Sequence, residues 1–194
     1  TRMRNAAIGF FAIALLICSI PTAVNAQLGA YDQNFEGLVQ TDPGALGADG
    51  WLIFANVFAP DGITYLYGYG VFPAPNSGPP FAFCTIAAGE GGPAQGAQQL
   101  TVFSDYNNVD HGVGNIIESN VFQEQTIVAG DVGGMWYFTF EAKAGDLAGS
   151  STALAFIKTL DPNNGFNTTN FITLDTTSLP TTWGGYALSI SIDP

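Results

Sequence analysis

Three tyrosines alternate with other residues along one short segment of the sequence. Tyr65, Tyr67 and Tyr69 are each two positions apart, so a regular strand would place all three rings on one face. Sugars present apolar C–H faces edged by hydroxyl groups, and a flat ring with a polar tip suits such a ligand. The three tyrosines are therefore candidate ligands of a carbohydrate, although the structural alternative is the favoured interpretation of the spacing itself. The alternative is structural, because tyrosines are common in strands and these rings would then simply cover a sheet.

Side chains from other parts of the chain would complete this candidate site. Trp51 offers a further aromatic surface, and Glu118 and Asn120 offer hydrogen bonds to sugar hydroxyls. We assign no catalytic residue, because the sequence has no Gly-x-Ser-x-Gly elbow, phosphate-cradling loop or metalloprotease helix. A glycan-cleaving enzyme is the less favoured alternative. It needs only two facing carboxylates, and the chain has 16 Asp and Glu residues.

Two segments, 105–111 and 161–165, are rich in the oxygen ligands that calcium prefers. Both lack the bidentate Glu that completes a calcium loop, and Asp, Asn and Gly are also the usual residues of turns. An ordinary turn is therefore the favoured interpretation of each segment. His111 is the single histidine, and its lack of Cys or His companions argues against a zinc site.

The charge balance restricts the partners of the protein. The formal net charge is −12, and removing the predicted signal peptide leaves two lysines against all 16 acids, a net charge of −14. Such a surface repels phosphate backbones, so we exclude nucleic acid as a partner, and anionic membrane surfaces are disfavoured. The acids favour a structural Ca²⁺ as a cofactor. The alternative is an acidic, solvated surface that holds no specific cation.

Residues 1–26 have the features of a secretory signal peptide. Met3 is the predicted initiator, Arg4 supplies the positive region, and 6–20 form an apolar stretch that is too short to span a bilayer. Small residues precede Gln27, where we expect cleavage. The sequence thus predicts a secreted protein, extracellular or periplasmic, with no membrane span after signal cleavage.

Residues 27–194 are expected to form one all-β domain, an antiparallel β-sandwich of the jelly-roll type. The chain has 24 glycines and 11 prolines, which interrupt it at short intervals, and apolar residues alternate between them. Antiparallel sheets that pack one face on a core and expose the other face to solvent produce this pattern. Cys84, the one cysteine after signal removal, is expected in the core. The predicted core faces are Tyr186, Leu188, Ile190 and Ile192; Trp136, Phe138, Phe140 and Ala142; and Leu154, Phe156 and Leu160.

Five short motifs follow one another along the chain. They are the segment 33–37 around Phe35 and Glu36, Gly50-Trp51, the turn and strand 96–102, the strand 136–144, and the segment 181–186 around Trp183. In order and spacing these motifs resemble the β-jelly-roll carbohydrate-binding modules of the galactose-binding-like superfamily. The resemblance spans about residues 33 to 193 and implies a non-catalytic module that binds a polysaccharide or glycan.

The resemblance also implies a metal ligand. In this family the Glu of the opening strand and an Asp of a closing strand often share a structural Ca²⁺, and Glu36 matches the first of these. The motif of the closing strand has no counterpart before Asp193 and Pro194. We therefore expect a domain that lacks its last strand or strands, whose first strand has an open edge. A structural or adhesive extracellular surface protein stabilised by Ca²⁺ is the alternative function.

Overall fold

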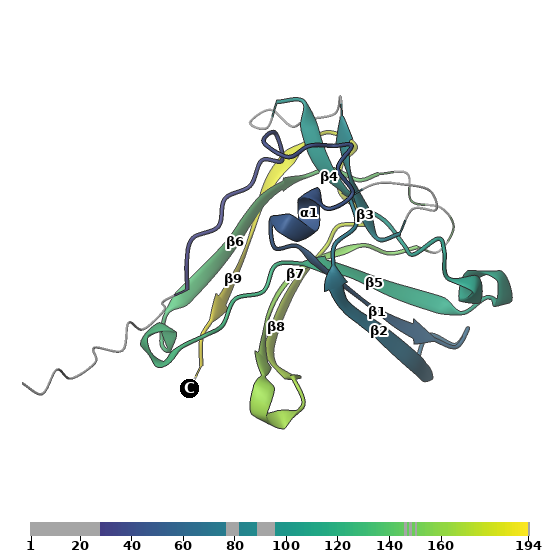
Figure 1. Cartoon of the computed structure of the whole chain (residues 1–194). Coiled ribbons are helices and arrows are strands. Elements are labelled where there is room, and N and C mark those ends of the chain that lie inside the picture. Colours follow the sequence, from purple (N-terminus) through teal and green to yellow (C-terminus); the bar gives the residue numbers. More distant parts are fainter. Residues whose placement is uncertain are drawn as a thin grey trace, which may run out of the picture.

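The computed structural model describes residues 28–76, 82–88, 96–145, 147, 149 and 151–193, so the predicted signal peptide lies outside the described residues. The all-β class is confirmed (Figure 1). Within the described part no helix has the length and apolarity that a membrane span requires. The strands are β1 (Leu52–Phe58), β2 (Tyr65–Pro73), β3 (Cys84–Ala88), β4 (Gln98–Val102), β5 (Ile116–Phe122), β6 (Met135–Ala142), β7 (Leu154–Asp161), β8 (Asn167–Asp175) and β9 (Gly184–Ser191).

In the described residues helical structure is confined to short turns. They are α1 (Ala45–Ala48) and the 3₁₀ turns η1 (Val109–Val113), η2 (Ala129–Asp131) and η3 (Pro162–Asn164). The turn η3 falls in the segment 161–165, where the Asp161 side chain accepts a hydrogen bond from the Asn163 backbone N–H. This segment is an ordinary capped turn in the structure, in agreement with the favoured interpretation.

The strands of the first half form a three-stranded antiparallel sheet and a separate ladder. In the sheet β1 lies between β2 and β5, and β3 pairs with β4 in the ladder. The turn between β1 and β2 is held by Asp61, whose carboxylate accepts from the backbone N–H groups of Ile63 and Thr64. These bonds stabilise the charged form and lower the pKa of Asp61.

The main hydrophobic core covers one face of the β2–β1–β5 sheet. Ile53 and Ala55 of β1 pack there against Leu46 of α1 and against Phe83 and Cys84 at the start of β3. Cys84 is 1% exposed, as expected, and burial raises the pKa of its thiol to about 12. At neutral pH the thiol is therefore protonated, and it behaves as a small apolar residue.

The second half consists of two antiparallel pairs, β6 with β9 and β7 with β8. In the first pair Trp136 faces Ile190, Phe138 faces Leu188 and Phe140 faces Tyr186. The predicted apolar faces of these two strands therefore do lie on the same side of one ladder, and Leu188 and Ile190 are buried. The hydrogen-bonded ladders of the described residues are separate, so the jelly-roll arrangement stays a prediction.

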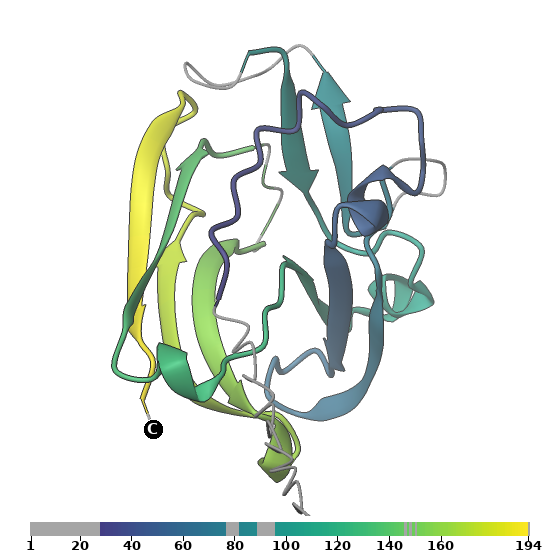
Figure 2. The ribbon, with the colours of Figure 1, turned by 60° about the vertical axis from the view of Figure 1, so that its left-hand side comes forward.

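An extended N-terminal segment, residues 28–34, runs between the two halves (Figure 2). At its start the Leu28 backbone N–H donates to the buried carboxylate of Asp131, and the Gly29 N–H donates to the Gln125 side chain. Farther along, the Tyr31 hydroxyl donates to Asp49 at 2.5 Å. These bonds fix the segment beside β6 without making it a strand of any sheet.

Candidate functional site

The three tyrosines of β2 do not share one face, because β2 is not regular. Tyr67 pairs with Val57, but Tyr65 pairs with Phe58, so Leu66 has no partner and the register shifts there. Such a bulge moves the following side chain to the opposite side of the sheet. The prediction of a continuous tyrosine stripe is therefore wrong.

Tyr67 and Tyr69 lie on the core side of the sheet and have a structural role. They are opposite the buried residues Val57 and Ala55, and the Tyr69 ring contacts Phe83 edge-on at 6.0 Å. The Tyr69 hydroxyl donates to Asp105 at 2.6 Å, and the Tyr67 hydroxyl donates to Asp110. Asn108 donates to both hydroxyls. The two tyrosines thus fix the loop before β5, and the structural alternative applies to them.

The environments of these phenols predict a biphasic alkaline titration. Burial, and then a hydrogen bond to a carboxylate, raise the pKa of Tyr31 and of Tyr69 to about 12, and the bond to Asp110 raises the pKa of Tyr67. Because the fold favours the neutral phenols, their contribution to stability is fully present below about pH 10 and is lost as the pH rises toward 12. Phenolate absorbance measured against pH should show a late phase that shrinks in Tyr31→Phe and Tyr69→Phe. If all tyrosines titrate in a single transition near pH 10, the hydrogen bonds and burial described for these phenols do not raise their pKa values.

Tyr65 lies on the opposite side of the sheet, which faces away from the core and carries the candidate site. Pairing across the three strands forms four rows on this side, and the candidate site comprises the three rows nearest to Tyr65. These three rows are Tyr65, Phe58 and Ile116; Gly68, Asn56 and Glu118; and Gly70, Phe54 and Asn120. We call the set Tyr65, Phe58, Asn56, Phe54, Glu118 and Asn120 the Glu118 face.

A hydrogen-bonded polar group occupies the centre of the Glu118 face. Oε1 of Glu118 accepts from Nδ2 of Asn56 at 3.3 Å and from Nδ2 of Asn120 at 2.9 Å. Both bonds are exposed to solvent. The two amides hold the carboxylate in one orientation, with its second oxygen and the two amide carbonyl oxygens as further acceptors.

Aromatic rings flank this polar group. The Tyr65 ring, 56% exposed, meets the Phe58 ring edge-on at 5.9 Å. The Tyr65 hydroxyl lies 2.9 Å from the place that a Cβ of Gly68 would occupy, and the Phe54 ring lies 3.2 Å from it. Glycine at this position therefore leaves room for both rings to lie close to the sheet. The result is an apolar border beside the hydrogen-bonding groups, exposed at Tyr65 and half-buried at Phe54 and Phe58.

Trp51 lies apart from the Glu118 face. It precedes β1, at the end of the sheet opposite Tyr65, and its half-buried ring packs against Phe35 at 5.8 Å. Its indole N–H donates to the Tyr31 hydroxyl at 2.8 Å and to Asp49 at 3.2 Å. The structure thus brings together Tyr65, Glu118 and Asn120 of the predicted site residues and leaves Trp51, Tyr67 and Tyr69 elsewhere.

Glu36, the predicted calcium ligand, accepts a hydrogen bond from a backbone N–H. Its Oε1 lies 2.5 Å from the N–H of Gln98, the first residue of β4. Gly96 lets the carboxylate approach, because a Cβ there would lie 3.2 Å from the Glu36 carboxyl carbon. Within the described ranges, no three His, Cys, Asp or Glu side chains gather as a metal site would require. Calcium binding stays a prediction.

The structure places His111 in contact with Ser104, a pair that sequence reasoning did not identify. Ser104 Oγ and His111 Nε2 are 3.1 Å apart in the exposed loop before β5. A serine nucleophile needs a base that a third group orients. No described carboxylate is hydrogen-bonded to this imidazole. The pair therefore gives no support to catalysis.

Sequence reasoning missed Asn56, Phe54 and Phe58. All three are on β1, where half-buried residues alternate with buried ones. Asn56 could have been identified from the sequence, because it is the one polar residue in the segment 52–58. An amide in an apolar strand needs a partner or solvent. Its partner Glu118 follows 62 residues later, a separation that the sequence does not resolve.

No family model, curated protein or solved structure matches this chain.

Proposed function

We propose that the protein is a non-catalytic carbohydrate-binding module that acts outside the cytoplasm and binds a polysaccharide or glycan at the Glu118 face. The observation that carries the proposal is the carboxylate of Glu118, held by two amides and flanked by the exposed ring of Tyr65. The predicted signal peptide supports an extracytoplasmic location, and the family resemblance supports a glycan ligand.

The chemistry of this face matches that of a sugar ring. A carboxylate and two carboxamides offer both donors and acceptors to neighbouring hydroxyls, and their mutual hydrogen bonds reduce the entropy that binding would otherwise cost. The Tyr65 and Phe58 rings would cover the apolar C–H face of the sugar. The negative charge of the chain disfavours anionic glycans, so we propose a neutral polysaccharide.

Binding is favoured over glycan cleavage for a stereochemical reason. Glycoside hydrolysis generally requires two carboxyl groups on either side of the scissile bond, about 5 to 10 Å apart. In the Glu118 face the two groups that flank the carboxylate are amides, Asn56 and Asn120. Carboxamides can position a sugar by hydrogen bonds but cannot act as the general acid or base of the reaction near neutral pH.

Tyr65→Ala and Glu118→Ala are each expected to weaken polysaccharide binding by roughly 10-fold or more, because each removes a group at the centre of the contact. The measurement is retention in native gels cast with neutral polysaccharides, after a glycan array has identified the ligand. Tyr67→Phe is the matched control, since this tyrosine of the same strand lies on the other side of the sheet. It should bind as the unmodified protein does.

The array can also contradict the proposal. If no neutral glycan binds, or if the Tyr65 and Glu118 variants keep full affinity while folding normally by circular dichroism, the Glu118 face is not a sugar site. If Tyr67→Phe loses affinity instead, the ligand contacts the core side of the sheet and this assignment of the face is wrong.

A further inference from the structure

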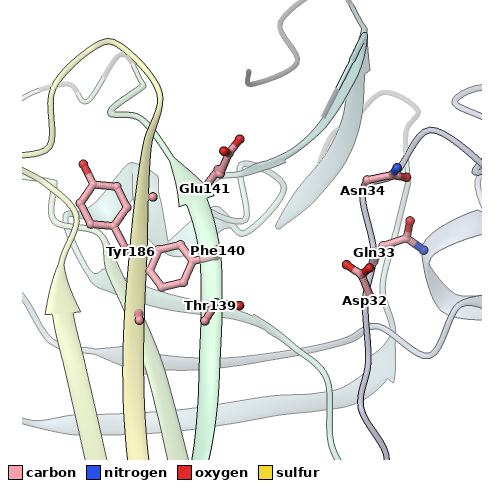
Figure 3. A pocket seen from close by; sticks show the side chains of 9 residues that line it. Asp32, Gln33, Asn34, Thr139, Phe140, Glu141 and Tyr186 are labelled. Atoms are coloured by element: carbon pink, nitrogen blue, oxygen red, sulfur yellow. The ribbon is translucent and has the colours of Figure 1, made fainter. Parts of the chain in front are cut away.

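One edge of β6 has no strand beside it in the described structure, and a groove runs along that edge. Within the described ranges β6 pairs with β9 alone. On the side of the unpaired edge lies a groove of about 560 Å³, lined by residues 139–141 of β6, by residues 185–187 of its partner β9, and by residues 32–34 on the far side (Figure 3). Figure 3 shows Asp32, Gln33 and Asn34 across the gap from β6, with β9 beside β6 on its other side.

The far wall of the groove also has unpaired backbone. Residues 30–34 are extended but belong to no ladder, and their peptide groups make no backbone hydrogen bond to another described residue. The hydrogen bonds that position this segment are made at its ends and by its side chains. For example, the Gln33 side-chain amide donates to the Asp49 carboxylate at 2.8 Å. The groove therefore lies between β6 and an extended segment whose N–H and C=O groups make no backbone hydrogen bonds to other described residues.

Both sides of β6 are exposed along this edge. Tyr137 is 68% exposed on one face of the strand and Phe138 is 37% exposed on the other. Side chains of a β-strand alternate between its faces, so a partner strand would cover both of these residues at once. A compact ligand such as a sugar would contact one face only.

The groove is acidic. Asp32 and Glu141 line it from opposite walls, and no Lys or Arg is among its described lining residues. Glu141 Oε2 is shielded from solvent and has no hydrogen-bond partner in the described structure. A buried, unpartnered carboxylate oxygen is costly, so a ligand that donates a hydrogen bond there would be stabilised.

We propose that this groove accepts an extended strand of a separate, cationic polypeptide, which adds to the free edge of β6. The strand would alternate apolar residues on the side of Phe138 and Phe140 with Lys or Arg on the side of Thr139 and Glu141. Backbone hydrogen bonds would supply affinity, and the cation opposite Glu141 would supply selectivity.

Charge determines the choice of this occupant. A second copy of the chain carries a net charge of −12 and would be repelled from an acidic groove. A cationic strand is attracted to the same groove and would satisfy Glu141. The inference is independent of the Glu118 face, because it uses β6 and the N-terminal segment and no residue of that face.

The test uses the full chain and an eight-residue synthetic peptide, matching the length of β6, that alternates valine with lysine. Binding is measured by fluorescence anisotropy of the labelled peptide, and hydrogen exchange locates it. We expect saturable binding, slower exchange of β6 amides and unchanged exchange in β1. A peptide with the same composition but two blocks of valine and lysine, and one with N-methylated amides along one edge, should each bind at least about 10-fold more weakly.

A charge swap separates strand addition from general attraction to an acidic protein. Glu141→Lys should weaken binding of the lysine peptide and improve binding of a glutamate peptide, each by roughly 10-fold. Glu141→Gln serves as the folding control. Equal binding of the alternating and block peptides, or protection spread over the whole chain, would overturn the proposal. If a neutral oligosaccharide slows exchange of the β6 amides, the groove is a sugar site instead. If sedimentation shows self-association and β6 is protected in the assembly, the groove binds a second copy of the chain.

Discussion

Replacing Asn76 with alanine should lower the free energy of unfolding by about 3 kcal/mol or more, a large fraction of the stability of a domain of this size. Asn76 is completely buried. Its amide Nδ2 donates to three backbone carbonyls, those of Val39, Gln40 and Asp42, at 3.0, 2.8 and 2.5 Å. Its Oδ1 accepts from the N–H of Ile86 at 3.1 Å.

This one side chain joins segments that have no other regular pairing. The chain at 39–42 leads into α1, and Ile86 is the middle residue of β3, so Asn76 connects the two elements that cover the core face of β1. Alanine would remove the acceptor of the Ile86 N–H and one donor from each of the three carbonyls, of which those of Val39 and Asp42 still accept from backbone N–H groups. A buried group left unsatisfied costs about 1 to 3 kcal/mol, and the cavity left by the missing side chain adds to this cost. Relaxation of the chain and entry of water reduce the total cost. We therefore expect a loss of about 3 kcal/mol and not the full sum over all the groups.

Thermal and urea unfolding followed by circular dichroism will measure the effect. We expect the Tm to fall by roughly 6 °C or more. Asn76→Asp should be at least as harmful, because its oxygens would face three carbonyl oxygens. Asn163→Ala is the matched control, an exposed asparagine in η3 whose loss should change stability by less than about 0.5 kcal/mol. If the unfolding curves of the Asn76 and Asn163 variants coincide, the hydrogen bonds of Asn76 do not contribute measurably to stability.

Sequence alternation was sufficient to predict the class of the fold and several of its faces. In β6 and β9 the apolar residues recur at every second position, and the structure pairs Phe138 with Leu188 and Trp136 with Ile190. Period-two patterning is a local property, so it can be found without knowing which strands are neighbours. The burial of Cys84 was predictable for the same reason, since it requires only the residue type and its apolar surroundings.

The site was only partly predictable, because its geometry depends on pairing between distant strands. Tyr65 was identified for a stripe that does not exist, and a bulge at Leu66, which depends on the partner strand β1, moved it to the face that carries Glu118. Glu118 and Asn120 were identified as polar strand residues, but Asn56 was not. The register that aligns Asn56 with Glu118 is a tertiary property.

Replacing Gly70 with alanine should lower the free energy of unfolding by about 2 to 4 kcal/mol and weaken glycan binding as well. Gly70 has φ +113°, a conformation that L residues rarely adopt, and a Cβ there would lie 2.7 Å from the carbonyl oxygen of Ile53. The same Cβ would lie 2.9 Å from Cα of Phe54 and 3.1 Å from its ring. Backbone atoms cannot move aside as a flexible side chain does, so β1 itself must shift.

That shift connects stability with the proposed site. Phe54 and Asn120 share a row with Gly70, and Asn120 donates to Glu118, so displacing β1 would separate the groups that hold the carboxylate. Gly185→Ala is the matched control, a strand glycine without positive φ whose Cβ would meet nothing within 4 Å. It should unfold at an unchanged or slightly higher urea concentration, because alanine has less backbone entropy to lose. If Gly70→Ala is as stable as Gly185→Ala, then β2 does not require glycine there. If it is unstable but binds glycan normally at low temperature, the Gly70 row lies outside the contact and the site is limited to the rows of Glu118 and Tyr65.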